Sequence, residues 1–162
     1  MTIAVQPIAP WLDAVVESAQ DLAANTLSMV DVVFGEPRQG LPSGVRGAYV
    51  ALVGDEANVQ FGLVASHEVC DRMARAMLML DPEDELSADD MIDAVSELAN
   101  ILGGGVKRRM VARDPSLRLG LPLFVSGDIS ASQRSSVWSV AMSLSGTEAH
   151  LLVLQHDAAD HR

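Results

Sequence analysis

The sequence is poor in cysteine and in positive charge, and each shortage excludes a class of protein. Cys70 is its single cysteine, so no disulfide can form within the chain and no cluster of thiolate ligands can assemble in it. The 11 Lys and Arg residues are outnumbered by 22 Asp and Glu residues, which gives a net charge of -11. This charge repels phosphate backbones and anionic lipid surfaces, so we expect no nucleic acid and no membrane among its partners.

Long apolar runs are also missing. No apolar stretch approaches the roughly 20 residues that a membrane helix requires, and residues 1–10 carry no Lys or Arg ahead of their apolar side chains. We therefore expect a cytoplasmic protein. The four histidines show no spacing of four residues and no nearby cysteine beyond Cys70, so the sequence predicts no metal site.

An internal repeat organises the chain. Residues 13–20 resemble residues 93–100, and residues 40–42 resemble residues 120–122 at the same offset of 80 positions. Superposing the two copies at this offset without a gap gives ten identities, which makes chance a weak explanation. Further along, the offset between similar segments grows to 92, which predicts an insertion of twelve residues at about 126–136 in the second copy.

The repeat predicts the organisation of the domain. We expect one domain over residues 1–162, built from halves at about 11–66 and 87–156 that are joined by an amphipathic helix at about 67–80. Residues 82–85 are expected to form a solvated linker. Each half should begin with a helix and continue into strands, which predicts an α+β fold with an antiparallel sheet and two long helices packed on it in pseudo-twofold relation.

Local signals set the expected boundaries of these elements. Ser66 and Ser87 are suitable N-caps for two helices, and the run Gly103–Gly105 should weaken the second helix after four turns. Gly54 and Gly146 indicate hairpin turns between strands. Runs rich in β-forming residues predict strands at 47–53, 59–65, 117–126, 137–144 and 150–154.

Four residues of the second predicted helix form a narrow stripe. Asp93, Glu97, Asn100 and Gly104 are separated by steps of four, three and four, which places them on one side of a helix. The apolar residues fall on the opposite side, where burial accounts for them, so the stripe should face solvent or a partner. Gly104 has no side chain, so the surface of another protein could come close to the polar groups beside it.

The stripe has two interpretations. An isolated pattern of this kind is most simply a solvated, charged helix face. However, Asp13, Glu17, Gln20 and Ala24 form the same stripe on the first helix. Packing alone does not preserve polar residues between two copies, so the repetition favours a functional stripe.

The motif resembles a known signature. Asp93, Glu97 and Asn100, followed by Ile-Leu-Gly-Gly and, after 21 intervening residues, by Pro122, resemble the pattern of the CheC, CheX and FliY phosphatases: Asp or Ser, three residues, Glu, two residues, Asn, about 22 further residues and a Pro. The interval to Pro122 is one residue short of that pattern. The resemblance covers most of the chain, because that family is itself an internal duplication of a helix and strands.

The resemblance implies a function. It implies a phosphatase that removes phosphate from the aspartate of a CheY-like response regulator, with Glu97 and Asn100 as the functional pair and Asp93 and Gly104 supporting them on the same helix face. It also implies a homodimer with no cofactor of its own, while Mg²⁺ is supplied by the regulator. The alternative is a non-catalytic module of the same fold, either an adaptor that binds receivers or a relative of flagellar-switch proteins.

The first copy of the motif departs from the pattern. Gln20 stands where Asn is expected, so Asp13, Glu17 and Gln20 form either a degenerate copy or a second, displaced site. We favour the degenerate copy, because a misplacement of about 1 Å removes most of a positioning effect.

Two other features invite a functional interpretation. The run from Gly103 to Lys107 superficially resembles a phosphate-binding loop, but it follows a helix, and Arg108 stands where Ser or Thr would bind Mg²⁺. Basic residues gather after the stripe, either to dock an acidic regulator or, as we favour, to complement the carboxyl end of the helix. These residues are Lys107, Arg108, Arg109, Arg113 and Arg118.

Overall fold

A computed structural model describes residues 7–156. It has three helices, α1 (Ala9–Asn25), α2 (His67–Leu78) and α3 (Ala88–Met110). Its strands are β1 (Val32–Phe34), β2 (Arg38–Gln39), β3 (Arg46–Val53), β4 (Asn58–Ala65), β5 (Arg118–Leu119), β6 (Leu123–Val125), β7 (Ser135–Leu144) and β8 (Thr147–His156). The predicted α+β class is confirmed, as are the antiparallel hairpins β3–β4 and β7–β8 at the two glycine turns.

The sheet is arranged symmetrically about its centre. Its strand order is β1-β7-β8-β4-β3-β5, with β2 also pairing with β7 and β6 with β3. The central strands β4 and β8 pair antiparallel over seven positions, centred on the pair Gly62 and Leu152. The short strands of each half thus pair with the long strand of the other half, which ties the two halves together. This order fits the predicted pseudo-twofold relation, while the duplication itself stays a prediction.

One part of the predicted register is wrong. The matching segments 40–42 and 120–122 do not occupy equivalent places: the first lies between β2 and β3, and the second lies between β5 and β6. Gly120 donates its backbone N–H to Ala51 of β3, and the break beside Pro122 divides the single strand predicted at 117–126 into two short ones. The two short strands β1 and β2 were not predicted from the sequence at all.

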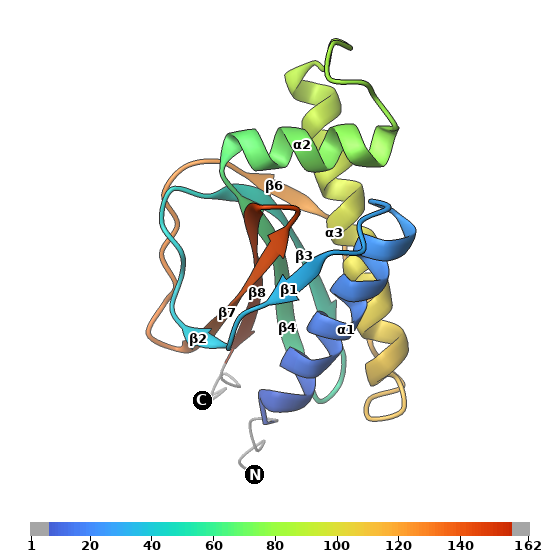
Figure 1. The fold of residues 1–162 in the computed structure, drawn as a ribbon. Helices are drawn as coiled ribbons and strands as arrows, with labels where there is room; N and C mark the ends of the chain where they lie inside the picture. Colours follow the sequence, from blue (N-terminus) through green and yellow to red (C-terminus); the bar gives the residue numbers. More distant parts are fainter. Residues whose placement is uncertain (1–6, 157–162) are drawn as a thin grey trace.

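The helices cover one face of the sheet (Figure 1). The chain runs upward through α1 and downward through α3, so these two helices lie antiparallel, and α2 crosses near the upper end of α3. Between helices and sheet lies one core that is almost entirely aliphatic, and Trp11 packs against Phe61 there in a tilted arrangement, with ring centroids 6.0 Å apart. The connections β2–β3 and β6–β7 lie side by side away from the helices and line a shared hollow.

The glycine run does not interrupt α3 after four turns, contrary to our expectation, because two of its residues make close packing possible. A Cβ on Gly103 would come within 2.7 Å of Val50 and 2.8 Å of Leu119, and a Cβ on Gly105 would come within 2.9 Å of Ser18. These distances are shorter than any normal carbon contact. The glycines therefore let α3 approach both β3 and α1, and the packing holds the helix as far as Met110.

The segment between α2 and α3 is organised rather than simply solvated. Helix α2 ends at Leu78, two residues before the predicted boundary, because Met79 adopts a left-handed conformation with φ 53° and ψ 41°. Arg75 then holds the following turn by donating to the carbonyl oxygens of Asp81 at 3.3 Å and Asp84 at 2.6 Å, while its Nε binds Asp71 at 2.8 Å. Between residues 7 and 156, no helix is long and apolar enough to cross a membrane.

Candidate active site

Helix α3 presents the predicted stripe on a well-defined helix. Ser87 is its N-cap, as predicted, and its Oγ accepts a hydrogen bond from the N–H of Asp90 at 3.0 Å. Acidic residues occupy the first turn and Lys107, Arg108 and Arg109 the last, so charges of both signs complement the helix dipole. The motif lies in the middle of this helix, where the backbone is fixed on both sides.

The stripe faces outward. Asp93 and Glu97 are exposed, and Asn100 and Gly104 are half-buried. The opposite side of α3 is buried in the core, through Met91, Ala94, Val95, Leu98, Ala99, Leu102, Val106 and Met110. The helical projection therefore correctly divided the packed side of α3 from the accessible one.

The carboxylate and amide of the motif have no internal partners. Among the described residues, neither Glu97 nor Asn100 makes a side-chain hydrogen bond or an ion pair, and the same holds for Asp93. Folding therefore does not require these groups to bind one another or the rest of the chain. They remain available to a second molecule.

Gly104 differs from the glycines on either side of it. A Cβ placed there would meet only Nη1 of Arg108, at 3.8 Å, which is an ordinary contact with the flexible end of a side chain. Packing thus requires glycine at positions 103 and 105 but not at 104. Since Gly104 weakens the helix without serving the core, an open surface beside Asn100 is the remaining physical reason for it.

In the first copy of the motif, the glutamate is already bound by another residue of the chain. Nε of Arg109 binds Oε2 of Glu17 at 3.2 Å, and Nη2 of Arg109 binds Oδ2 of Asp21 at 2.5 Å. Nη1 donates to Ser18 at 3.3 Å. Asp13 and Gln20 of this copy are exposed and make no side-chain hydrogen bond among the described residues. Glu17, the counterpart of Glu97, is therefore held in an ion pair between α1 and α3.

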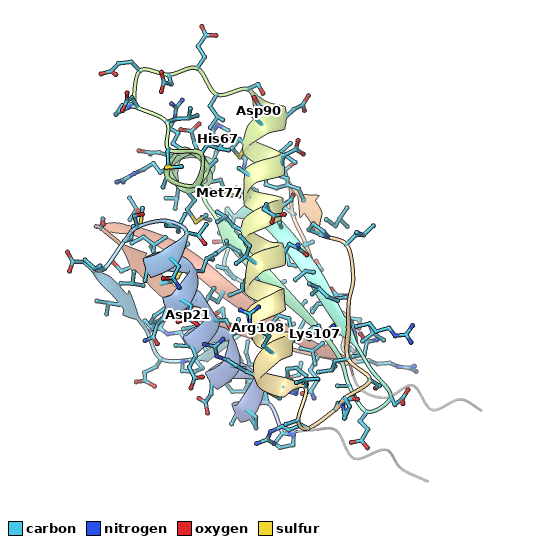
Figure 2. All side chains as sticks on the ribbon, turned by 90° about the vertical axis from the view of Figure 1, so that its right-hand side faces the viewer. Asp21, His67, Met77, Asp90, Lys107 and Arg108 are labelled. Carbon is cyan, nitrogen blue, oxygen red and sulfur yellow. The ribbon has the colours of Figure 1, made fainter. Side chains whose placement is uncertain are left out.

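Sequence reasoning missed this use of Arg109. The sequence placed Arg109 in a basic cluster at the helix end, whereas its partner Glu17 is 92 residues away in the chain. Only the packing of the two helices brings them together. Lys107 and Arg108 make no ion pair within the described part of the chain; both lie in the lower part of α3, Arg108 on the side of Asp21 of α1 and Lys107 on the other side (Figure 2).

The comparison with known families gives this arrangement an identity. The sequence profile of the family described as chemotaxis phosphatase CheX matches residues 46–144, which is more than half of the chain and includes the whole of α3. The chain belongs to the CheX family. The predicted resemblance is thereby confirmed at the level of the family. The roles of individual residues stay predictions.

Solved CheX and CheC-like structures share the fold. A CheX from Desulfovibrio desulfuricans is 17% identical, with a TM-score of 0.72 over 92% of this chain and 98% of the other. A CheC-like protein from Shewanella is 18% identical, with a TM-score of 0.76 over 91% and 97%. The CheX in a CheX–CheY–BeF3–Mg²⁺ complex from Borrelia burgdorferi is 20% identical, with a TM-score of 0.70 over 95% and 99%. No curated protein matches the sequence.

Proposed function

We propose that this CheX-family protein hydrolyses the aspartyl phosphate of a CheY-like response regulator. The observation that carries the proposal is the pair Glu97 and Asn100, which lies on an open face of α3 and has no partner within the described residues. Membership of a phosphatase family supports the reaction class. The complex of a Borrelia CheX with CheY, beryllofluoride and magnesium supports the kind of partner.

Asn100 is proposed to orient the attacking water. An aspartyl phosphate is an activated acyl phosphate, so its hydrolysis needs little covalent assistance from the phosphatase. A side-chain amide can both donate to and accept from a water molecule, and can thereby hold it in line with the bond that breaks. The water adds to phosphorus, the bond from phosphorus to the aspartyl oxygen breaks, and inorganic phosphate and a free carboxylate result. A hundredfold to thousandfold acceleration requires about 3 to 4 kcal/mol, which positioning can supply.

Glu97 is proposed to fix the complex. It precedes Asn100 by three residues, so both side chains emerge from the same side of α3 within one turn. An exposed carboxylate suits an ion pair with a Lys of the regulator, and such a pair would set the register of the two proteins. Glu97 then acts as a positioning residue rather than as a base. Mg²⁺ and the charge that neutralises the phosphoryl group would come from the regulator, and this chain needs no metal of its own.

The alternative is a module that binds receivers without hydrolysing them. Both functions use the same exposed face, and they differ in the need for the amide. The presence of Asn100 at the correct spacing from Glu97 favours the enzyme. We further propose, from the family resemblance, that the protein acts as a homodimer in the cytoplasm.

The decisive experiment compares wild type with Asn100→Ala. Each CheY-like receiver of the source organism is phosphorylated, and the loss of phosphate is followed with each variant. We expect wild type to accelerate the loss and Asn100→Ala to lose about 100-fold or more of this acceleration while still binding a beryllofluoride-activated receiver. If wild type binds a receiver but accelerates the dephosphorylation of none, the enzymatic function is ruled out and the binding module remains.

A further inference from the structure

An apolar groove lies directly beside the proposed active site. The end of α2 and the first turns of α3 enclose it, and its apolar lining consists of Met77, Leu78, Leu80, Leu86 and Ala94. Asp93 and Glu97 belong both to this groove and to the stripe. Figure 2 shows Met77 on α2 beside the upper part of α3, with Asp90 above it. A partner whose phosphoryl group reaches Asn100 therefore lies next to the groove.

The apolar side chains here are unusually accessible. Leu78 is 43% exposed, and Met79, between two residues that line the groove, is 91% exposed. Met79 also has a positive φ of 53°, a conformation that disfavours any side chain with a Cβ and in which glycine is the usual residue at a helix end. Neither the backbone nor the core explains a methionine at this position. Contact with a partner would explain it, since methionine adapts to apolar surfaces.

The rim of the groove is fixed before any partner arrives. Arg75 ties the turn after α2 to the helix, and the backbone N–H of Asp81 donates to Oδ2 of Asp84 at 2.7 Å. This network holds the connection between Leu80 and Leu86, both of which line the groove. A preformed surface loses less conformational entropy on binding than a flexible loop does.

The charged residues that line the groove all have the same sign. Four of its nine lining residues are acidic, namely Glu85, Asp90, Asp93 and Glu97, and none is basic. We propose that the groove receives the surface of the phosphorylated response regulator beside its aspartyl phosphate, and that this surface presents an apolar side chain flanked by Lys or Arg. This rests on the proposed function. It makes Leu78 and Met79 determinants of which regulator is bound, whereas Asn100 determines the rate of hydrolysis.

The test separates binding from chemistry. Dephosphorylation is measured against the concentration of a phosphorylated receiver, and affinity is measured with the same receiver activated by beryllofluoride. We expect Leu78→Ser and Met79→Gly to raise KM and Kd about 5-fold to 30-fold and to leave kcat unchanged. Met79→Gly also removes the backbone strain, so its melting temperature should equal or exceed that of wild type. Weaker binding in this variant therefore cannot come from a damaged fold.

Controls fix the interpretation. Val53→Ser alters a side chain that is 48% exposed at the far end of β3, and it should change neither constant. Glu85→Gln should slow association at low salt and flatten its dependence on salt. Unchanged KM and Kd in both Leu78→Ser and Met79→Gly would overturn the proposal. If these variants change the oligomeric state but not the affinity for the receiver, the proposal is also overturned, and the groove is assigned to a second copy of this chain. Absence of hydrolysis by wild type tests only the proposed function, because the affinity measurement still reports on the groove.

Discussion

Arg109 of α3 binds Glu17 of α1 at 3.2 Å. Arg109 follows the second copy of the motif in the sequence, and Glu17 is the glutamate of the first copy. Hydrogen bonds to Asp21 and Glu17 raise the pKa of this guanidinium further above its ordinary value, and it stays charged at every accessible pH. Glu97 makes no such ion pair among the described residues. The two helices thus carry similar stripes whose glutamates differ: Glu17 is held in an ion pair between the helices, and Glu97 is left open.

Two substitutions test whether the first copy of the motif, with Gln20 in place of Asn, is degenerate. In the Asn100→Ala background, Arg109→Gln releases Glu17, and Gln20→Asn restores the expected amide. If the first copy is only degenerate, Arg109→Gln alone should restore no dephosphorylation, because Gln20 still places its amide one methylene too far. Measured phosphatase activity in Asn100→Ala/Arg109→Gln would instead reveal a second site that Arg109 masks. Activity only in the triple variant would assign the defect to Gln20.

The same substitution has an expected cost in stability. Arg109 joins two helices through partly exposed ion pairs, in which the Glu17 and Asp21 side chains are 62% and 57% exposed. Solvent screens such pairs, so Arg109→Gln should lower the free energy of unfolding by only about 0.5 to 1 kcal/mol in a denaturant titration. A loss several times larger would show that the contact between Arg109 and Ser18 matters more than the ion pairs.

The sequence predicted the elements whose signals are local. Ser66 and Ser87 cap the helices as expected, and Gly54 and Gly146 lie in the turns of the two hairpins. The stripe was correctly divided from the core, because helical periodicity requires no knowledge of neighbouring elements.

The features that the sequence did not predict depend on contacts between distant residues. Strand β1 has three residues, too few for a periodic pattern, and exists because Val32 to Phe34 pair with β7 more than 100 positions away. The glycines of α3 suggested a weak helix, and only the nearby Val50, Leu119 and Ser18 show why the helix needs them. The ion pair of Arg109 with Glu17 likewise joins residues that are far apart in the sequence.

The three adjacent glycines of α3 provide a matched comparison. Gly103→Ala and Gly105→Ala push a methyl group into Val50 and Ser18, respectively, and should destabilise the protein by about 1 to 3 kcal/mol. Gly104→Ala meets only the end of Arg108 and should stabilise the helix by about 0.5 to 1 kcal/mol. Thermal and chemical unfolding would measure all three.

Gly104→Ala also tests the proposed interface. If the missing side chain at Gly104 lets a receiver come close to Asn100, this variant should bind an activated receiver more weakly although its fold is more stable. Full affinity and full phosphatase activity in Gly104→Ala would contradict the role assigned to this glycine.

Cys70 should be unreactive in the folded protein. It is fully buried, and burial raises the pKa of its thiol to about 11, although the charge of Arg46 and a backbone hydrogen bond of Ala65 act in the opposite direction. At pH 8 only about one thiol in a thousand is then ionised, and that fraction is shielded from reagents. A disulfide reagent should therefore label Cys70 slowly in buffer and rapidly in denaturant. Labelling in buffer at the rate of a free thiol would show that α2 opens readily.

Asp114 should make stability depend on pH in the acidic range. It is buried behind the β3–β4 turn, where it accepts hydrogen bonds from the Ser116 hydroxyl, from the N–H of Ser116 at 3.0 Å and from the N–H of Glu56 at 3.2 Å. These bonds, led by the Ser116 hydroxyl, lower its pKa below the ordinary value of 3.8 against the opposing effect of desolvation. A carboxyl group with a lowered pKa stabilises the fold above its unfolded pKa, and this stabilisation is lost as the pH falls through the folded pKa.

Removing the charge of Asp114 should therefore remove this pH dependence. Asp114→Asn should be less stable than wild type by a constant amount between pH 5 and pH 7, and the difference should shrink below about pH 3.8 as the wild-type carboxylate is protonated. Denaturant titrations at several pH values measure the difference directly, and the other carboxylates cancel because both proteins carry them. Asp55→Asn is the matched control, because its carboxylate makes no hydrogen bond among the described residues and only its backbone N–H binds Ser116. A difference between wild type and Asp114→Asn that stays constant down to pH 3 would show that the contacts of Asp114 do not depend on its charge.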